Sequence, residues 1–300
     1  MQTSITPTPL TVGKLLGRTI GIYRAHSGVF LRTTVVFYIP LAVLAFFYAE
    51  DILTTTIFDF VTFPIEAIVS LSLISHCVEL LHGRSLTVKA AIGRGLRRLP
   101  ADIGLQVVSG AVYIGATIIL AIPIWVGLFR TDFPLGEIRD ALSVPYRPGD
   151  IEAVTNVLGI ALWGGFGSCL TGLLILIAFL YLSARWIIAE TALMVEGIGP
   201  LESLASSWHL SRDFVLRSVG YLLLLSIVMG LVGGLIGALM GFASVTLLSA
   251  YDQSTQAGFN SFVSNLLDIF VMPFYVTAIV VYYFDLRVRK EKYSFGIVQE

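Results

Sequence analysis

The chain has 300 residues, of which 56% are hydrophobic and only 13% are charged. A soluble domain averages about 45–50% apolar and about 25% charged residues, so this composition predicts an integral membrane protein. The formal net charge of −1 lacks the basic field that nucleic-acid binding requires, and we expect no nucleic-acid partner. The two cysteines, Cys77 and Cys169, lie inside apolar runs and fit neither a disulfide framework nor a metal-binding spacing.

Six apolar runs are each long enough to cross the hydrocarbon core of a bilayer, which takes about 20 residues of helix. In chain order they are residues 29–49, 57–81, 103–129, 153–184, 214–249 and 261–284. The first run begins near Val29, behind a long segment that contains three basic residues, which is too late for a cleavable signal peptide. We therefore expect a single all-α membrane domain over residues 1–300, with a retained N-terminus and a polar tail at 285–300.

Basic residues fall almost entirely on one side of these runs. Of the 19 Lys and Arg residues, only Arg130, Arg139 and Arg147 fall on the other side, all in the loop 130–152. Loops rich in Lys and Arg remain in the cytoplasm, so this asymmetry places both termini there. The expected location is the inner membrane of a bacterial cell, which the chain crosses as a multi-pass protein.

A similar segment precedes each pair of apolar runs. The segments are LTVGKLLGRTIGIYR from Leu10, LTVKAAIGRGLRRLP from Leu86 and LESLASSWHLSRDFV from Leu201. Each has apolar residues at helical spacing, which predicts an amphipathic helix in the headgroup region with its apolar face toward the membrane. The chain would then be three parallel repeats of a cytoplasmic amphipathic helix plus a helical hairpin, over residues 10–82, 86–184 and 201–284. The alternative is that these junctions resemble one another by chance.

The apolar faces of these helices set which side chains should meet the membrane. They are Val12, Leu16, Ile20 and Tyr23 in the first helix, Val88, Ile92, Leu96 and Leu99 in the second, and Leu201, Leu204 and Trp208 in the third. Ser211 is the expected N-cap at which the third amphipathic helix ends and the fifth run begins.

Small residues recur every four positions in two of the runs. They are Gly164, Ser168 and Gly172 in the fourth run, and Gly233, Gly237 and Gly241 in the fifth. Hydrocarbon supplies little drive for helices to associate, so small residues that permit close backbone contact favour packing. These spans could pack on each other or on a partner chain. The alternative is a flexible glycine-rich helix without a specific neighbour.

The carboxylates Glu66, Glu79 and Asp268 lie inside the predicted spans. An ionisable group in hydrocarbon is costly and is by default a candidate functional site. Glu66 and Asp268 belong to the outer half of the bilayer, and each lies near a proline, Pro64 or Pro273, which frees backbone groups. One hypothesis is a proton- or cation-linked transport site. The other is a carboxyl near the interface, or a protonated carboxyl hydrogen-bonded within the bundle.

His76 lies deep in the second run, three residues before Glu79. A neutral imidazole is a frequent metal ligand, so His76 is a candidate ligand of haem or chlorophyll. The other histidines all lie near the cytoplasmic interface, and a packed hydrogen-bonding role is the alternative. We therefore expect bound lipid, and treat a pigment or haem as a hypothesis only. None of the sequence motifs of common enzymes occurs, and the chain is not expected to be an enzyme.

Two stretches are similar to a known family. GPLESLASSWHLSRD (199–213) and YYFDLRVRKE (282–291) resemble the membrane domain associated with bacterial glycerophosphoryl diester phosphodiesterases and its stand-alone relatives. The opening VGKLLGRTIGIYRAHSGVF is also similar to the first helix of that family. Phe284 is inserted between the tyrosines and the aspartate of the second stretch, and Ser203-Leu204 stands where the family has Ala-Leu. The resemblance implies a membrane domain without the catalytic domain.

Both stretches contribute residues expected at the cytoplasmic interface. These are Trp208, Arg212, Arg287, Arg289 and Lys290, and the basic residues among them could pair with Asp285 or with lipid phosphates. None of these roles requires a specific activity.

Three functions remain open from the sequence. The first is a non-enzymatic membrane scaffold or accessory subunit, which other membrane protein subunits would join. The second is a transporter or lipid-handling protein, which the parallel repeats and Glu66 with Asp268 favour. The third is a membrane partner of a separate phosphodiesterase, which depends on the family resemblance alone.

Overall fold

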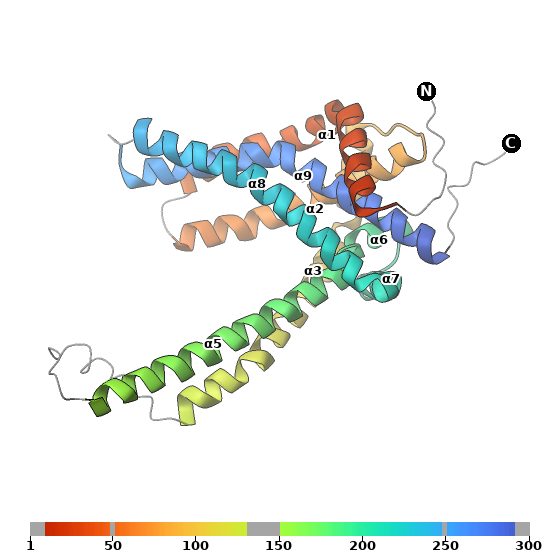
Figure 1. Ribbon diagram of the computed structural model, residues 1–300. Helices are drawn as coiled ribbons and strands as arrows, with labels where there is room; N and C mark the ends of the chain where they lie inside the picture. The colour runs from red at the N-terminus through yellow and green to blue at the C-terminus, as the bar shows by residue number, and fades with distance from the viewer. Residues whose placement is uncertain (1–9, 49–51, 131–150, 248–250, 292–300) are drawn as a thin grey trace. The chain divides into compact units, whose positions relative to one another are not determined.

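The computed structural model describes residues 10–48, 52–130, 151–247 and 251–291, and every regular element in these ranges is a helix (Figure 1). Six of the described helices are long and apolar enough to cross a membrane. This confirms the predicted all-α class, and the six helices are compatible with the predicted multi-pass membrane protein.

The chain divides into two compact units, residues 1–107 with 184–300 and residues 108–183. The first unit contains α1 (Val12–Tyr48), α2 (Ile52–Leu81), the start of α3 (Val88–Arg130) and the end of α5 (Ile151–Trp186). It continues with α6 (Ala189–Glu196), α7 (Pro200–Ser211), the 3₁₀ turn η1 (Arg212–Phe214), α8 (Val215–Leu247) and α9 (Gln253–Glu291). The three predicted repeats remain a prediction.

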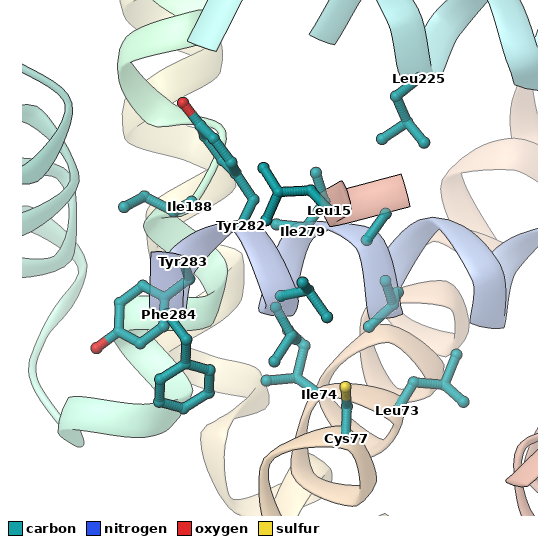
Figure 2. Close-up of a cluster of buried hydrophobic side chains, with 14 of the residues drawn as sticks. Leu15, Leu73, Ile74, Cys77, Ile188, Leu225, Ile279, Tyr282, Tyr283 and Phe284 are labelled. Carbon is teal, nitrogen blue, oxygen red and sulfur yellow. The ribbon is translucent and has the colours of Figure 1, made fainter. Parts of the chain in front are cut away.

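The core of the first unit surrounds α9. The helices α1, α2 and α8 all pack on it, and α1 and α9 share the most extensive contact in this unit. Figure 2 shows Leu73, Ile74 and Cys77 of α2 on one side of α9 and Leu225 of α8 on the other. The carboxyl-terminal half of α9 is buried on all faces, since every residue from Val276 to Leu286 is buried.

Proline in α9 explains part of its contact with α1. Pro273 has no N–H, so the carbonyl four residues earlier, on Ile269, loses its helical partner. The Thr34 hydroxyl of α1 donates to that carbonyl over 3.0 Å, and the Tyr23 hydroxyl donates to the Phe270 carbonyl over 3.2 Å. The predicted release of backbone groups by Pro273 is therefore used for helix packing.

Two of the predicted junctions between an amphipathic segment and a span are visible in the helices. In α1 the backbone leaves helical geometry at His26, three residues before the expected start of the first span. The third segment forms a separate helix, α7, which ends at Ser211 as expected. However, the Ser211 side chain makes no cap hydrogen bond, which corrects the predicted N-cap role. Its hydroxyl donates instead to the Arg185 carbonyl, at 3.2 Å.

The serines of α7 form its protein-facing side. Ser203, Ser207 and Ser211 are each fully buried, whereas Leu201 is 67% exposed and Trp208 is 37% exposed. Ser207 and Ser211 both donate to the Arg185 carbonyl, which lies in the last turn of α5, where carbonyls lack helical partners. The serine face therefore joins α7 to the end of α5. Leu201 and Trp208 of the predicted apolar stripe are exposed, whereas Leu204 is buried against the protein.

The second unit is a helical hairpin made by the remainder of α3 and α5. Tyr113 of α3 contacts α5 through its hydroxyl, 3.1 Å from the Ser183 hydroxyl, and through its ring, centred 5.1 Å from that of Phe179. Large apolar side chains on both helices, such as Ile119 and Leu173, are exposed. An exposed apolar surface of this kind fits contact with lipid.

Candidate functional site

Polar side chains gather where the two sequence stretches that resemble the phosphodiesterase membrane domain meet. We call this region the collar and define it as residues 10–18, 185–217 and 282–291. Its centre is Asp285, whose side chain is only 1% exposed. The Asp285 carboxylate accepts hydrogen bonds from the Leu10 N–H, from Arg217 Nη2 and from Arg289 Nε, each 2.8 Å long. Both arginines also donate to the Leu10 carbonyl. One carboxylate thus joins the N-terminal segment, α8 and α9.

A second network in the collar extends from α6 to the end of α9. The Tyr283 hydroxyl donates to Glu196 Oε1 over 2.8 Å, and Ser206 of α7 donates to the same carboxylate. Arg287 donates to the Tyr283 hydroxyl at 3.2 Å and forms an ion pair with Glu291 at 2.7 Å. Every polar group in this chain of contacts therefore has a partner within the protein.

Buried tyrosines complete the junction of α8 with α9. The Tyr282 hydroxyl lies 2.7 Å from the Ser218 hydroxyl, and the Tyr221 hydroxyl donates to the Ala278 carbonyl over 2.9 Å. The two rings stack with their centres 4.5 Å apart. A buried tyrosine is stable when its hydroxyl finds such a partner, so these residues act as packing groups.

Of the other residues predicted for the cytoplasmic interface, Lys290 and Trp208 contact the protein and Arg212 is exposed. Lys290 donates to the His209 carbonyl and lies 3.2 Å from Asp213, so it ties α9 to α7 and η1. Trp208 stacks under the Arg185 guanidinium, whose carbon is 3.8 Å from the ring centre. Arg212 is exposed at the end of α7.

The structure brings the two predicted outer carboxylates together. Glu66 in α2 and Asp268 in α9 lie near enough to each other, and to the buried Tyr38 phenol of α1, for electrostatic interaction. Glu66 is exposed and Asp268 is half-buried. The sequence did not predict that Glu66 and Asp268 lie near each other. The packing of α9 against α1 and α2 brings these two carboxyls and Tyr38 together.

His76 and Glu79 take separate places, although they lie one helical turn apart. His76 is 1% exposed, and its Nε2 lies 3.2 Å from the Thr33 hydroxyl, which fits the hydrogen-bonding alternative. Glu79 forms ion pairs with Arg84 at 2.8 Å and with Arg94 at 2.6 Å, at the end of α2. Within the described residues, no group of three or more His, Cys, Asp or Glu is arranged to hold a metal ion.

The glycines expected to mediate helix packing have open surroundings. A Cβ atom placed on Gly172, Gly233, Gly237 or Gly241 meets no described atom within 4 Å outside its own helix. The side-chain surroundings of Gly164 and Ser168 lie outside the described part of the structure. Close contact through these positions remains a prediction, and α8 presents its glycines without a described neighbour.

Two further carboxylates, Asp102 and Glu190, were not predicted from the sequence to form a site. Asp102 of α3 is fully buried, and Glu190 of α6 lies near enough for the two negative charges to act on each other. Asp102 follows three arginines in a segment that resembles a solvated surface. Glu190 stands alone in the apolar stretch WIIAETALMV, which was the available signal.

Comparison of the chain with protein-family models, with curated proteins and with solved structures gives no match. The resemblance to the phosphodiesterase membrane domain therefore depends on the residues quoted above and remains a prediction.

Proposed function

We propose that the chain is a non-enzymatic subunit of a larger membrane protein complex, with the collar on the cytoplasmic side of a bacterial inner membrane. The observation that carries this proposal is the internal use of the collar's polar groups. Tyr282, Tyr283, Asp285 and Arg289 all bond to other parts of the chain. Side chains committed in this way stabilise a scaffold and are not free to bind a substrate.

The surface of α8 supports the same proposal. A Cβ at Gly233, Gly237 or Gly241 meets no described atom within 4 Å, and large side chains elsewhere on α8, such as Leu235 and Phe242, are 66% and 72% exposed. A stripe of small residues between larger ones permits a partner helix to approach closely. The partner we propose is therefore a membrane helix of another subunit, with lipid covering the remaining apolar surface.

Replacing Gly237 tests this contact. We expect Gly237→Leu to lower the recovery of partner subunits at least about tenfold, because the larger side chain separates the helices, which corresponds to about 1.4 kcal/mol. The measurement is quantitative mass spectrometry of the protein extracted gently from its native membranes. Leu235→Phe, two residues along the helix, is the matched control and should leave recovery unchanged.

The thermal stability of purified Gly237→Leu distinguishes loss of a partner helix from disruption of the chain's own fold. No described atom contacts a Cβ at Gly237, so the melting temperature of the chain should stay close to that of the wild type. A large loss of stability in the isolated chain would show that the glycines pack within its own fold. That result, or unchanged partner recovery, would contradict the proposal.

A second candidate function is proton- or cation-linked transport, and the meeting of Glu66, Asp268 and Tyr38 favours it. If transport occurs, the variant Glu66→Gln with Asp268→Asn should abolish the proton flux that an imposed Na⁺ or K⁺ gradient drives into vesicles containing the protein. A pH-sensitive dye inside the vesicles measures the flux. Asp213→Asn, which changes an exposed carboxylate, is the control and should retain it. Equal flux in all three proteins would remove the pair from the mechanism.

A further inference from the structure

A small cavity lies between α2, α6 and α9, apart from the collar networks and from Glu66 with Asp268. Its volume is about 50 Å³. A buried water needs at least about 10–15 Å³ of such space, so the cavity has room for a small ion together with water. Its walls are formed by Ser70, Ile74, Ile187, Glu190, Thr191, Tyr275, Val276 and Ile279.

The polar lining of this cavity consists of oxygen atoms with unused hydrogen-bonding capacity. The Thr191 hydroxyl belongs to a fully buried residue and has no hydrogen-bond partner among the described residues. Glu190 Oε1 is likewise buried and unpartnered, while the Ser70 hydroxyl bonds to the same carboxylate. Unpartnered buried oxygens are costly, so a ligand that binds them offsets that cost.

Asp102 adds a second negative charge beside Glu190. It is fully buried, and neither of its carboxylate oxygens has a hydrogen-bond partner in the described part of the chain. The ion pairs that Glu79, Asp213, Asp285 and Glu291 form involve neither Asp102 nor Glu190. Buried carboxylates without a cationic partner must be neutralised, either by protons or by a bound cation.

The donor set distinguishes between classes of cation. Carboxylate and hydroxyl oxygens are hard ligands that suit alkali and alkaline-earth ions. The described residues contain no cluster of three or more His, Cys, Asp or Glu of the kind that holds a transition metal. The oxygen groups of Glu190, Thr191 and Ser70, with space for water, fit an ion that accepts irregular coordination.

We propose that Glu190, Thr191 and Ser70, with Asp102 beside them, bind one alkali metal cation whose remaining ligands are water molecules. The single positive charge of the ion balances one of the two carboxylates, the other of which holds a proton, and the ion connects α2 with α6. This site is independent of the proposed subunit function, since neither the collar nor the glycines of α8 take part in it.

Thermal unfolding of the purified full-length protein tests the site. NaCl or KCl is replaced stepwise by N-methyl-D-glucamine chloride at constant ionic strength and pH. We expect the wild-type melting temperature to rise saturably by about 5 °C in Na⁺ or K⁺, because the ion binds only the folded state. Glu190→Gln and Asp102→Asn should lose this dependence, while Asp213→Asn should retain it.

Thr191→Val keeps the proposal testable if a carboxylate variant does not fold. This substitution preserves side-chain shape and removes one proposed ligand, so half-saturation should need several-fold more cation. Equal melting temperatures in NaCl, KCl and N-methyl-D-glucamine chloride would overturn the proposal. They would do so even if the melting temperature changed with pH, because the carboxyls would then hold protons and not a metal cation. A cation effect that Glu190→Gln and Thr191→Val leave unchanged would overturn it as well.

Discussion

Asp285→Ala is expected to be the most destabilising single substitution in the collar, at about 3–5 kcal/mol. Removing this carboxylate leaves Arg217 and Arg289, whose side chains are 19% and 20% exposed, without their shared counter-ion. It also leaves the Leu10 N–H without its acceptor. The melting temperature of the detergent-solubilised protein should fall by roughly 10 °C.

Asp213→Ala is the matched control for this experiment. Asp213 also pairs with a basic residue of α9, Lys290, at 3.2 Å, but its side chain is 64% exposed. An exposed ion pair contributes about 0–1 kcal/mol, so the melting temperature should change little. Equal effects of the two substitutions would contradict a structural role for the buried carboxylate.

The second large effect is expected where α3 crosses α2. A Cβ on Gly95 would lie 2.8 Å from the Ser72 hydroxyl and 3.0 Å from the Ile68 carbonyl oxygen. Because a backbone atom cannot move aside as a flexible side chain does, Gly95→Leu must separate the two helices. Overpacking of this kind costs about 1–3 kcal/mol, and we expect the upper end for leucine.

Gly93 provides the control two residues away on the same helix. A Cβ there meets nothing within 4 Å, and leucine is a better helix former than glycine. Gly93→Leu should therefore leave the melting temperature unchanged or raise it slightly. If both substitutions destabilise the protein equally, the close approach of α3 to α2 at Gly95 does not explain the result.

Helix positions were more predictable from the sequence than helix packing. Hydropathy and spacing predicted the break in α1 near residue 29 and the end of α7 at Ser211, which the structure places at His26 and Ser211. These boundaries follow from local properties of the chain. Lipid accepts apolar side chains as readily as a protein core does, so apolar periodicity does not tell which face packs on protein.

Small residues decide that packing instead. Ala91 and Gly95 of α3 and the serines of α7 face neighbouring helices, whereas Leu96 and Leu201 are 50% and 67% exposed. A serine stripe in sequence resembles a polar, solvated face. The sequence does not show that this stripe lies opposite the Arg185 carbonyl, which accepts hydrogen bonds from Ser207 and Ser211.

In the candidate sites too, the sequence predicted which residues matter better than it predicted which of them meet. Glu66 and Asp268 were predicted because a carboxylate inside a long apolar run is conspicuous. Their proximity was not predictable, since it depends on how α9 packs against α2. Asp102 and Glu190 were missed because basic neighbours surround one and the other belongs to α6, a short helix that periodicity did not reveal.

The most direct test of the proposed function is the mass of the particle obtained when the protein is gently extracted from its native membranes. The account predicts a discrete assembly in which the 32.7 kDa chain is accompanied by stoichiometric amounts of at least one other membrane protein. A lone chain or a homo-oligomer with bound lipid would contradict the subunit proposal. The transport candidate at Glu66 and Asp268 would then become the leading function.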